Sequence, residues 1–252
     1  MSATQKKILR GTLSVVVFLV VWEVVARLWF VPAILPAPTT IARELVSYAA
    51  EGKLGYDLLM SGQRVLVGFL FGSLLGSVLG LLLGSFKASR WLLEPPLQFF
   101  RFIPPIAWLT PVLIWFGIGE NGKYVLITYT TTFMVMINTY AGVASIRQNR
   151  LRAARCLGAN RWQVFRHVII PSTLPHILDG MQIGMANSLQ TVVVAEMLAA
   201  NEGLGFLIIN SRISLATELA YVAIFLLGVI GLLADSSFRA FATRIAWKYR
   251  LA

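Results

Sequence analysis

Charged residues are scarce in this chain of 252 residues, since Asp, Glu, Lys and Arg together make up 13% of it and hydrophobic residues make up 57%. The mean hydropathy of +0.73 is far above that of an average soluble domain. The single cysteine, Cys156, excludes an intrachain disulfide. The two histidines, His167 and His176, form no usual short metal-ligand spacing with it. The sequence therefore predicts a membrane protein without a metal site.

Acidic residues are outnumbered by basic ones, 11 against 22, which gives a formal net charge of +11. A charge of this size can indicate a nucleic-acid partner. Here, however, the basic residues form short clusters at the ends of apolar runs instead of one soluble face. We therefore expect no nucleic-acid partner, and we interpret the charge as a determinant of membrane topology.

Six apolar segments are long enough to cross the hydrocarbon core, which requires roughly 20 mostly apolar residues in a helix. They cover residues 9–30, 64–84, 97–118, 124–145, 177–198 and 219–238. The third contains Pro104, Pro105 and Pro111, so we expect it to be kinked or broken. The sixth is expected to end in a polar turn at Asp235. The predicted fold class is an all-α integral membrane protein with six transmembrane helices.

Lysine and arginine gather on one side of these spans, and such residues mark the cytoplasmic side. That side receives the N-terminal Lys6 and Lys7, the six arginines between Arg147 and Arg166, and the basic residues of the C-terminus. The opposite side mixes fewer basic residues, among them Arg64 and Lys123, with acidic ones. We expect a multi-pass protein with both termini in the cytoplasm. The first span should be an uncleaved helix, because no clear small-x-small cleavage site follows it.

The basic segment at 147–176 interrupts the apolar spans. Six arginines near mid-membrane would cost on the order of 15 to 20 kcal/mol, so this segment lies outside the lipid. Gly158 is expected to end one short helix in the left-handed conformation, and Asn160 to cap a second. We expect Pro171 to end the second helix and Pro175 to start the next. The pattern predicts two short helices joined by a sharp corner.

Spacing alone leaves two interpretations of this corner, one of which is a loop that sets topology and contacts anionic lipid. The other rests on a motif. Ala153-Ala154, three residues, Gly158, nine residues and then Val168-Ile169-Ile170-Pro171 resembles the EAA loop of ABC importer permeases, whose pattern is E-A-A, three residues, G, nine residues, I-x-L-P. Arg152 replaces the acidic residue, so no role that depends on that acid is carried over.

Three further stretches resemble the nitrate, sulfonate and taurine branch of these permeases. They are ILPAPTTIARELV at 34–46, FIPPIAWLTPVLIWFGIGE at 102–120 and VVAEMLAANEGLGFLI at 193–208. The resemblance implies the type I ABC importer permease fold in the bacterial cytoplasmic (inner) membrane. It also implies a non-catalytic subunit without a cofactor of its own, since ATP and Mg bind to a separate ATPase subunit.

The resemblance further implies ATP-driven import of a small solute by alternating access. The expected substrate is a small organic or inorganic anion such as a sulfonate, taurine, nitrate or bicarbonate. The implied partners are a second permease copy, two cytoplasmic ATPase subunits and an external solute-binding protein, with membrane lipid around them. The ATPase-coupling residues would be Ala153, Ala154, Gly158, Arg161, Trp162 and Phe165. Residues 1–55 would form an N-terminal helix and external segment, and residues 56–245 the core domain with its coupling loop at 147–176.

Polar residues dilute the fifth span, where unpaired polar groups would cost several kcal/mol against hydrocarbon. Asn187, Ser188, Gln190 and Thr191 therefore either form hydrogen bonds between helices or line a translocation path. Glu196, near the outer end, is either a structural ion pair or part of a gate. The following segment, loosened by Gly203 and Gly205, is expected to be a short gate helix that does not span the membrane.

Glycines at positions 68, 72, 76, 80 and 84 recur every four residues on the second span. Small residues on one face allow a neighbouring helix to approach closely, so we expect tight helix packing here, the alternative being a sliding surface used during transport. Glu23 on the first span is expected to join helices. The G-x-x-x-x-G-K spacing from Gly117 to Lys123 resembles a phosphate-binding loop, but Tyr124 stands where Ser or Thr should meet magnesium. We interpret it as an external turn.

Two other functional classes are considered. A stand-alone membrane enzyme, such as a lipid-modifying transferase, should gather catalytic side chains, yet only His167, His176 and Asp179 come together, without nucleophile or metal spacing. An ion channel should carry a filter sequence or charged pore residues, and none stands out.

Overall fold

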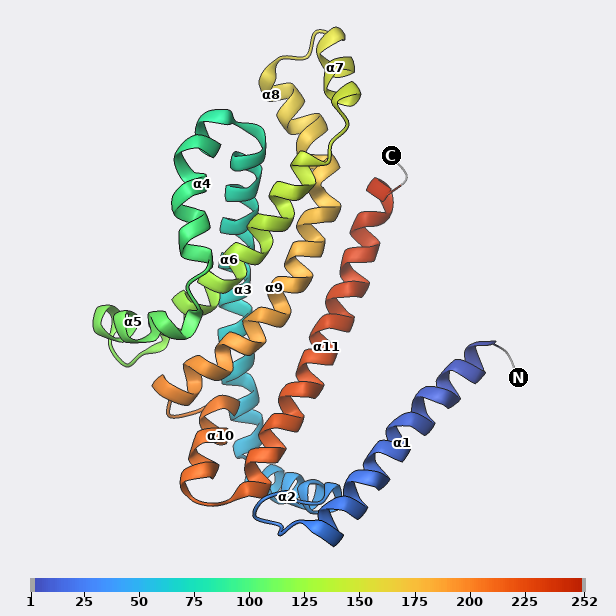
Figure 1. The fold of residues 1–252 in the computed structure, drawn as a ribbon, viewed down its shortest axis with the longest axis vertical. Coiled ribbons are helices and arrows are strands. Elements are labelled where there is room, and N and C mark those ends of the chain that lie inside the picture. The colour runs from blue at the N-terminus through green and yellow to red at the C-terminus, as the bar shows by residue number, and fades with distance from the viewer. Residues whose placement is uncertain (1–2, 251–252) are drawn as a thin grey trace.

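The computed structural model describes the backbone of residues 3–250 and the side chains of residues 10–245. Over this part of the chain it is built from helices, with no strand (Figure 1). The α-helices are α1 Ala3–Trp29, α2 Pro38–Ala50, α3 Lys53–Ser85, α4 Lys87–Arg101, α5 Leu109–Phe116, α6 Glu120–Ala144, α7 Gln148–Cys156, α8 Arg161–Val164, α9 Ile170–Ala199, α10 Leu204–Ile213 and α11 Thr217–Arg250. A 3-10 turn, η1 Pro105–Trp108, precedes α5, and a π-helical turn, η2 Phe165–Ile169, joins α8 to α9. The expected all-α fold is confirmed.

Glycines bring α3 into direct contact with α6 at the centre of the bundle. A β-carbon added to Gly68, Gly72, Gly76, Gly80 or Gly84 would lie 2.5 Å from an atom of α6. No side chain fits at that distance, so the expected tight packing along this face is confirmed. In lipid, such contact supplies packing energy that the hydrophobic effect cannot give between helices.

α6 also packs against α9, again through small residues. Gly180 and Gly184 of α9 would place a β-carbon 2.8 Å from Asn138 and 3.1 Å from Thr131, respectively. Val65, Ile127 and Val192, one from each of α3, α6 and α9, form a buried cluster. The three helices thus form the core to which the other elements attach.

By length and composition, three helices of the described chain can cross a membrane, namely α1 from Arg10, α3, and α11 up to Ile245. Two bent pairs, α4 with α5 and α8–α9 with α10, raise this number to five if each pair is one span. The expected fourth span, α6, has 25 residues but is not among them. It packs against α3 and α9, and the hydroxyls of Thr130, Thr131 and Thr132 bond to carbonyls of its own helix, so protein instead of lipid surrounds these polar groups.

The third expected span is broken, as its prolines predict. The chain turns by 94° between α4 and the η1–α5 segment. Pro104 has an extended backbone and Pro105 opens the 3-10 turn, so neither continues α4. The Tyr129 hydroxyl of α6 lies within hydrogen-bond distance of the carbonyls of Phe100 and Ile103, and so provides the backbone at the break with a partner from another helix.

Two expected boundaries are wrong. α3 begins at Lys53 instead of Arg64, because the charged residues of its first turns are paired within the protein. α11 does not turn at Asp235 but continues to Arg250. The Asp235 carboxylate accepts a hydrogen bond of 2.7 Å from Gln182 of α9 and pairs with Arg239, one helical turn later, at 2.9 Å, so it stays within the helix.

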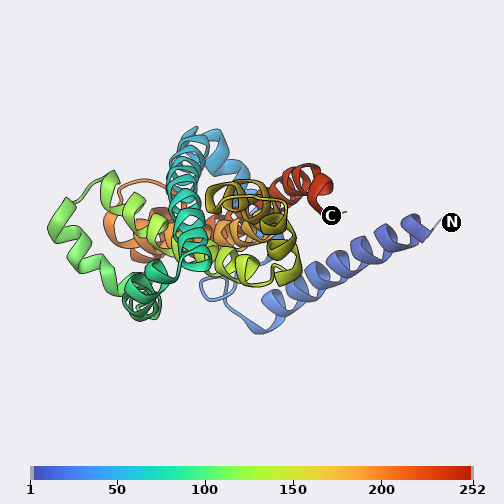
Figure 2. The same cartoon turned by 90° about the horizontal axis from the view of Figure 1, so that it is seen from above.

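α1 leaves the bundle, and only its C-terminal end lies close to other elements (Figures 1 and 2). There Glu23 accepts hydrogen bonds from the Thr39 amide at 3.0 Å and the Thr39 hydroxyl at 2.7 Å. Thr39 belongs to the first turn of α2, so the expectation that Glu23 joins two helices is confirmed. α7 and α8 lie at one end of the molecule, and α2 and α10 at the other (Figure 1).

Candidate functional site

The corner between α7 and α8 is formed by a glycine that ends α7 and by an asparagine that caps α8. Gly158 has φ +82°, a conformation that L side chains rarely adopt, and its amide donates to the Arg155 carbonyl at the end of α7. Asn160 caps α8, because its side chain accepts from the Gln163 amide while the Gln163 side chain accepts from the Asn160 amide, both at 2.8 Å. The expected two helices with a sharp corner are confirmed.

The expected end of the second helix at Pro171 is wrong. The chain passes from α8 through the π turn into α9 without a break, and both Pro171 and Pro175 lie inside helix. The π turn explains this, because the Ile170 amide bonds to the Phe165 carbonyl five residues back and re-registers the helix just before Pro171. The second part of the corner is therefore rigidly continuous with the expected fifth span.

Apolar side chains project from this corner. The Leu157 side chain is 89% exposed and that of Trp162 is 63% exposed. Trp162 stacks on Phe165 with 5.5 Å between ring centroids, and Phe165 packs against Phe86, at the end of α3, at 5.7 Å. A groove of about 980 Å³ runs between the α3–α4 corner and the α7–α8 corner. It is lined by Phe86, Lys87, Arg155, Arg161 and Phe165, among others.

The other residues expected to couple to an ATPase lie around the same corner. Ala153 and Arg161 are exposed and Ala154 is half-buried. The six expected coupling residues thus share one end of the molecule, on α7, the corner, α8 and the first residue of the π turn. No acidic side chain occurs between Glu120 and Asp179, so the surface formed by residues 147–170 carries only positive charge among its charged groups.

The four polar residues expected to form hydrogen bonds or line a path, Asn187, Ser188, Gln190 and Thr191, lie on two faces of α9. Ser188 and Thr191 are buried against α6, where their hydroxyls lie 2.7 Å from Thr131 and 3.1 Å from Thr130. Gln190 is exposed, and Asn187 is half-buried with its amide bonded to the Ile183 carbonyl of its own helix. Ser188 and Thr191 therefore form hydrogen bonds between helices, whereas Asn187 and Gln190 lie on a strip that no other helix of this chain covers fully.

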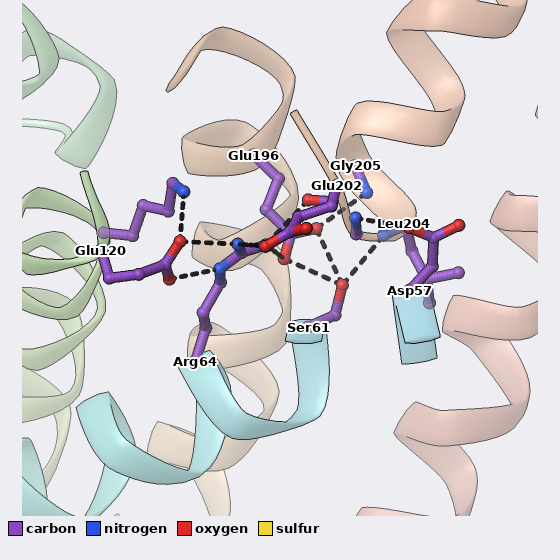
Figure 3. Close-up of polar contacts among 10 residues, drawn as sticks. Asp57, Ser61, Arg64, Glu120, Glu196, Glu202, Leu204 and Gly205 are labelled. Carbon is purple, nitrogen blue, oxygen red and sulfur yellow. Dashed lines mark hydrogen bonds and ion pairs between the residues drawn. The ribbon is translucent and has the colours of Figure 1, made fainter. Parts of the chain in front are cut away.

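Glu196 lies in a buried ionic network at the end of α9, shown in Figure 3. Arg64 of α3 and Glu196 are both fully buried, and their side chains pair at 2.8 Å. The same guanidinium forms two bonds of 2.7 Å to the Glu120 carboxylate of α6 and donates to the Glu202 carbonyl at 2.8 Å. Lys123 pairs with Glu120 at 2.7 Å. A bidentate, multiply bonded guanidinium is the arrangement in which a buried ion pair can offset its desolvation cost.

The first three amides of the α10 region are each bonded to a side chain from another element. The Gly203 amide donates to Asp57 at 2.8 Å, the Leu204 amide to the Ser61 hydroxyl at 2.9 Å, and the Gly205 amide to Glu196 at 2.9 Å. A helix start leaves such amides without partners inside the helix. The capping is therefore provided by α3 and α9 instead of by residues of α10.

Asp57 has a second partner in Tyr48 of α2, whose hydroxyl donates to the carboxylate at 2.6 Å. Burial, and then the hydrogen bond to Asp57, raise the pKa of Tyr48 above its usual value. The phenol thus remains a donor over the physiological pH range, and α2 is tied to the same network. A cavity of about 640 Å³ lies beside it, lined by Tyr48, Tyr56, Asp57, Glu202 and Phe206, among others.

Sequence reasoning missed the partners of Glu196. The only available signal was the mixture of Arg64 and Lys123 with Glu120, Glu196 and Glu202 on the side assigned to the exterior.

The G-x-x-x-x-G-K spacing from Gly117 to Lys123 serves the turn between α5 and α6 instead of phosphate binding. Gly117, at φ +70°, ends α5, and Lys123 is buried and paired with Glu120, so it offers no free cation to a phosphate.

Comparison with known proteins identifies the family. Residues 72–247 match the family described as "Binding-protein-dependent transport system inner membrane component". The taurine transport system permease protein TauC of Escherichia coli (strain K12) is 36% identical over 241 residues, which cover 93% of this chain and 87% of TauC. The putative aliphatic sulfonates transport permease protein SsuC of the same organism is 38% identical over 218 residues, which cover 86% of this chain and 83% of SsuC.

Among solved structures, the MetNI methionine ABC transporter in an inward-facing conformation contains a chain with the same fold. The TM-score is 0.68 at 18% identity, and the match covers 78% of this chain and 98% of that chain. At that identity the likeness concerns the fold alone. The family match and the two relatives, together with the helical fold, establish that this chain belongs to the binding-protein-dependent transport system inner membrane components, the non-catalytic permease subunits of ABC importers, in which a separate subunit is the ATPase.

Proposed function

We propose that two copies of this chain form the membrane channel of an importer that moves a small sulfonate or a related small anion into the cell. Two ATPase subunits would bind on the cytoplasmic side, and a solute-binding protein would deliver the substrate from outside. The substrate class is supported by the two relatives, since TauC is a taurine transport permease and SsuC a putative aliphatic sulfonates transport permease.

The observation that carries the proposal is the corner between α7 and α8. It lies at one end of the molecule, exposes Leu157 and Trp162, and continues through the π turn into α9. A push on this corner by an ATPase would therefore act on the helix that runs through the core. Ala153, Ala154, Gly158, Arg161, Trp162 and Phe165 would form the contact, and closure of the ATPase dimer would drive alternating access.

We propose that α9 also provides the wall of the translocation path. Of the four polar residues Asn187, Ser188, Gln190 and Thr191, the two that do not bond to α6 are Asn187 and Gln190, so they would face the path and the second copy. Ser188 and Thr191 would support this wall from behind through their bonds to α6. Glu196 would hold the outer end of the path in place. In this arrangement the basic corner and both termini are cytoplasmic, which agrees with the distribution of lysine and arginine.

The test is ATP-driven taurine uptake into liposomes that contain the permease and its ATPase, with the binding protein added. Gly158→Val should abolish uptake by straining the corner, since the φ of +82° disfavours any side chain although the space around it is open. Gly52→Val is the matched control, because Gly52 has φ +78° and equally open surroundings at the other end of the molecule. Equal loss of uptake in both variants, or in neither, would contradict the proposed coupling role.

A further inference from the structure

The segment after α9 is held by contacts that would all have to break before it could move away from α3. It bends by 47° from α9, and its amides at Gly203 and Leu204 are bonded to Asp57 and Ser61 of α3. The Glu202 carbonyl is bonded to Arg64, also of α3. Of the Glu196, Ser61 and Arg64 side chains, none is more than 3% exposed, so water cannot replace the lost partners cheaply.

The two glycines of this segment make room for a carboxylate. A β-carbon at Gly203 would lie 2.6 Å from the Glu196 carboxyl group, and one at Gly205 would lie 2.5 Å from the Val193 carbonyl oxygen. Gly203 also has φ +107°. Glycine is thus required by close approach to α9 at both positions, which tightens the segment against the core instead of loosening it.

Electrostatic attraction between the carboxylates of the ionic network and the N-terminus of α10 also holds α10 in place. Arg64 and Lys123 provide two positive charges, whereas Asp57, Glu120, Glu196 and Glu202 provide four negative ones when ionised. The excess negative charge lies at the start of α10, where the helix dipole places partial positive charge. Glu196 accepts one of the amides there and Asp57 another, so the dipole and the carboxylates attract each other.

We propose that Arg64 is a positioning residue for transport. It fixes α10 to α3, α6 and α9, so that the segment after α9 moves with these helices as one rigid body instead of opening as a hinged gate. This inference rests on the proposed transport function, but the position of α10 can be measured without transport. Arg64 is suited to the role because its guanidinium contacts Glu120, Glu196 and Glu202, which come from α6, α9 and the loop before α10.

The first measurement is hydrogen exchange of the Gly203–Gly205 amides in the permease embedded in lipid nanodiscs. These amides should be protected, and Ser61→Ala should speed exchange about tenfold by removing one buried acceptor. Arg64→Lys should speed it as well, because an ammonium cannot form the bidentate pair together with the other bonds. Glu51→Gln, which removes an exposed carboxylate on the same side of the molecule, should leave exchange unchanged. Rapid exchange of these amides in the unaltered protein would overturn the proposal whether or not the protein transports taurine.

The second measurement separates rigid-body motion from hinge opening. Tyr56 of α3 and Phe206 of α10 line the same cavity, so Tyr56→Cys with Phe206→Cys can be bridged by a bifunctional thiol reagent after Cys156→Ser removes the native thiol. Taurine uptake should persist after bridging if α10 moves with α3. Uptake that stops on bridging, while the unbridged double variant still transports, would show a hinge and refute the inference.

A control for this measurement uses the proposed path. Gln190→Cys, in the same background, should transport less than the unaltered protein but measurably before bridging. A bridge between the two copies should stop the remaining uptake because the two walls can no longer separate. If the Gln190 bridge stops uptake and the α3–α10 bridge does not, the inference is supported. A failure to bridge Gln190 contradicts the dimer arrangement of the proposed function, and the inference on Arg64 is then decided by hydrogen exchange: slow exchange of the Gly203–Gly205 amides supports it and rapid exchange refutes it.

Discussion

The hydroxyl of Ser188 on α9 lies 2.7 Å from the hydroxyl of Thr131 on α6, and both side chains are fully buried. Each hydroxyl also lies 2.8 Å from a carbonyl oxygen of its own helix four residues back, so one hydroxyl can donate to the other while the second donates to its own carbonyl. Polar groups at this depth are thus satisfied inside the protein, which removes the need for water at this point of α9. Gln190, two residues later, has no such enclosure.

The two residues should therefore respond differently to substitution. Ser188→Ala is expected to lower the free energy of unfolding by about 1 kcal/mol, the scale of hydrogen bonds between membrane helices, and to leave taurine uptake of the folded fraction intact. Gln190→Leu is expected to change stability by less than about 0.5 kcal/mol while reducing uptake. Thermal unfolding in detergent and uptake in liposomes measure the two effects. Loss of uptake from Ser188→Ala with unchanged stability would place Ser188 in the path itself.

Close packing of α3 on α6 predicts a contrast within a single helix. Gly76→Ala should destabilise the protein by about 1 to 3 kcal/mol, because the new methyl group would lie 2.5 Å from the Thr132 carbonyl oxygen and 2.8 Å from Val135. Gly62→Ala, where the space is open, should be neutral or should stabilise α3 by up to about 1 kcal/mol through its helix propensity. The measurement is unfolding in denaturing detergent. Equal effects of the two substitutions would refute close packing on this face.

Local and periodic features of this protein could be derived from its sequence. A spacing of four keeps glycines on nearly one helix face, so close packing by a neighbouring helix followed from positions alone, whereas the identity of that neighbour, α6, did not. Gly158 and Asn160 determine the backbone of their immediate neighbours, so the corner between α7 and α8 could also be predicted from the sequence. The broken third span followed from the lost donors of its prolines. In each case the deciding interaction lies within one turn or along one face of a helix.

Features that depend on distant partners could not be derived. Arg64 and Glu196 are 132 residues apart, and nothing in either segment indicates the other. Without that pairing, Glu196 could equally be a gate residue, and α3 appeared to begin after its charged turns. Pro171 misled for a different reason, since a π turn just before it allows the helix to continue. The count of spans by composition likewise misses α6, in which the hydroxyls of Thr128, Thr130, Thr131 and Thr132 find partners on α3, on α9 or on its own backbone.

The orientation of the chain can be tested through its native thiol. Cys156 is exposed at the end of α7, next to the basic corner that we assign to the cytoplasm. A membrane-impermeant maleimide should therefore leave it unlabelled in intact cells and should label it in inside-out vesicles. No substitution is needed, because the chain has one cysteine. Labelling of intact cells would reverse the assigned topology and move the ATPase contact to the other end of the molecule.

Leu157 offers the most direct test of the surface that we propose as the ATPase contact. Leu157 is 89% exposed beside Gly158, and exposure of a large apolar side chain to water is unfavourable. If the corner inserts into an ATPase subunit, this side chain becomes buried and acts as a central contact. Leu157→Ala should then reduce retention of the ATPase during purification by about tenfold or more, the scale of a strong interface contact.

Ile118→Ala is the control. Ile118 is 82% exposed in the turn between α5 and α6, away from the corner, so the variant should retain the ATPase fully. Reduced retention should also raise the fraction of permease that binds no ATPase without changing its unfolding temperature, since an exposed side chain contributes little to the folded subunit. Full retention in Leu157→Ala would exclude this side chain from the contact and leave Trp162, on the other side of the corner, as the apolar residue to test.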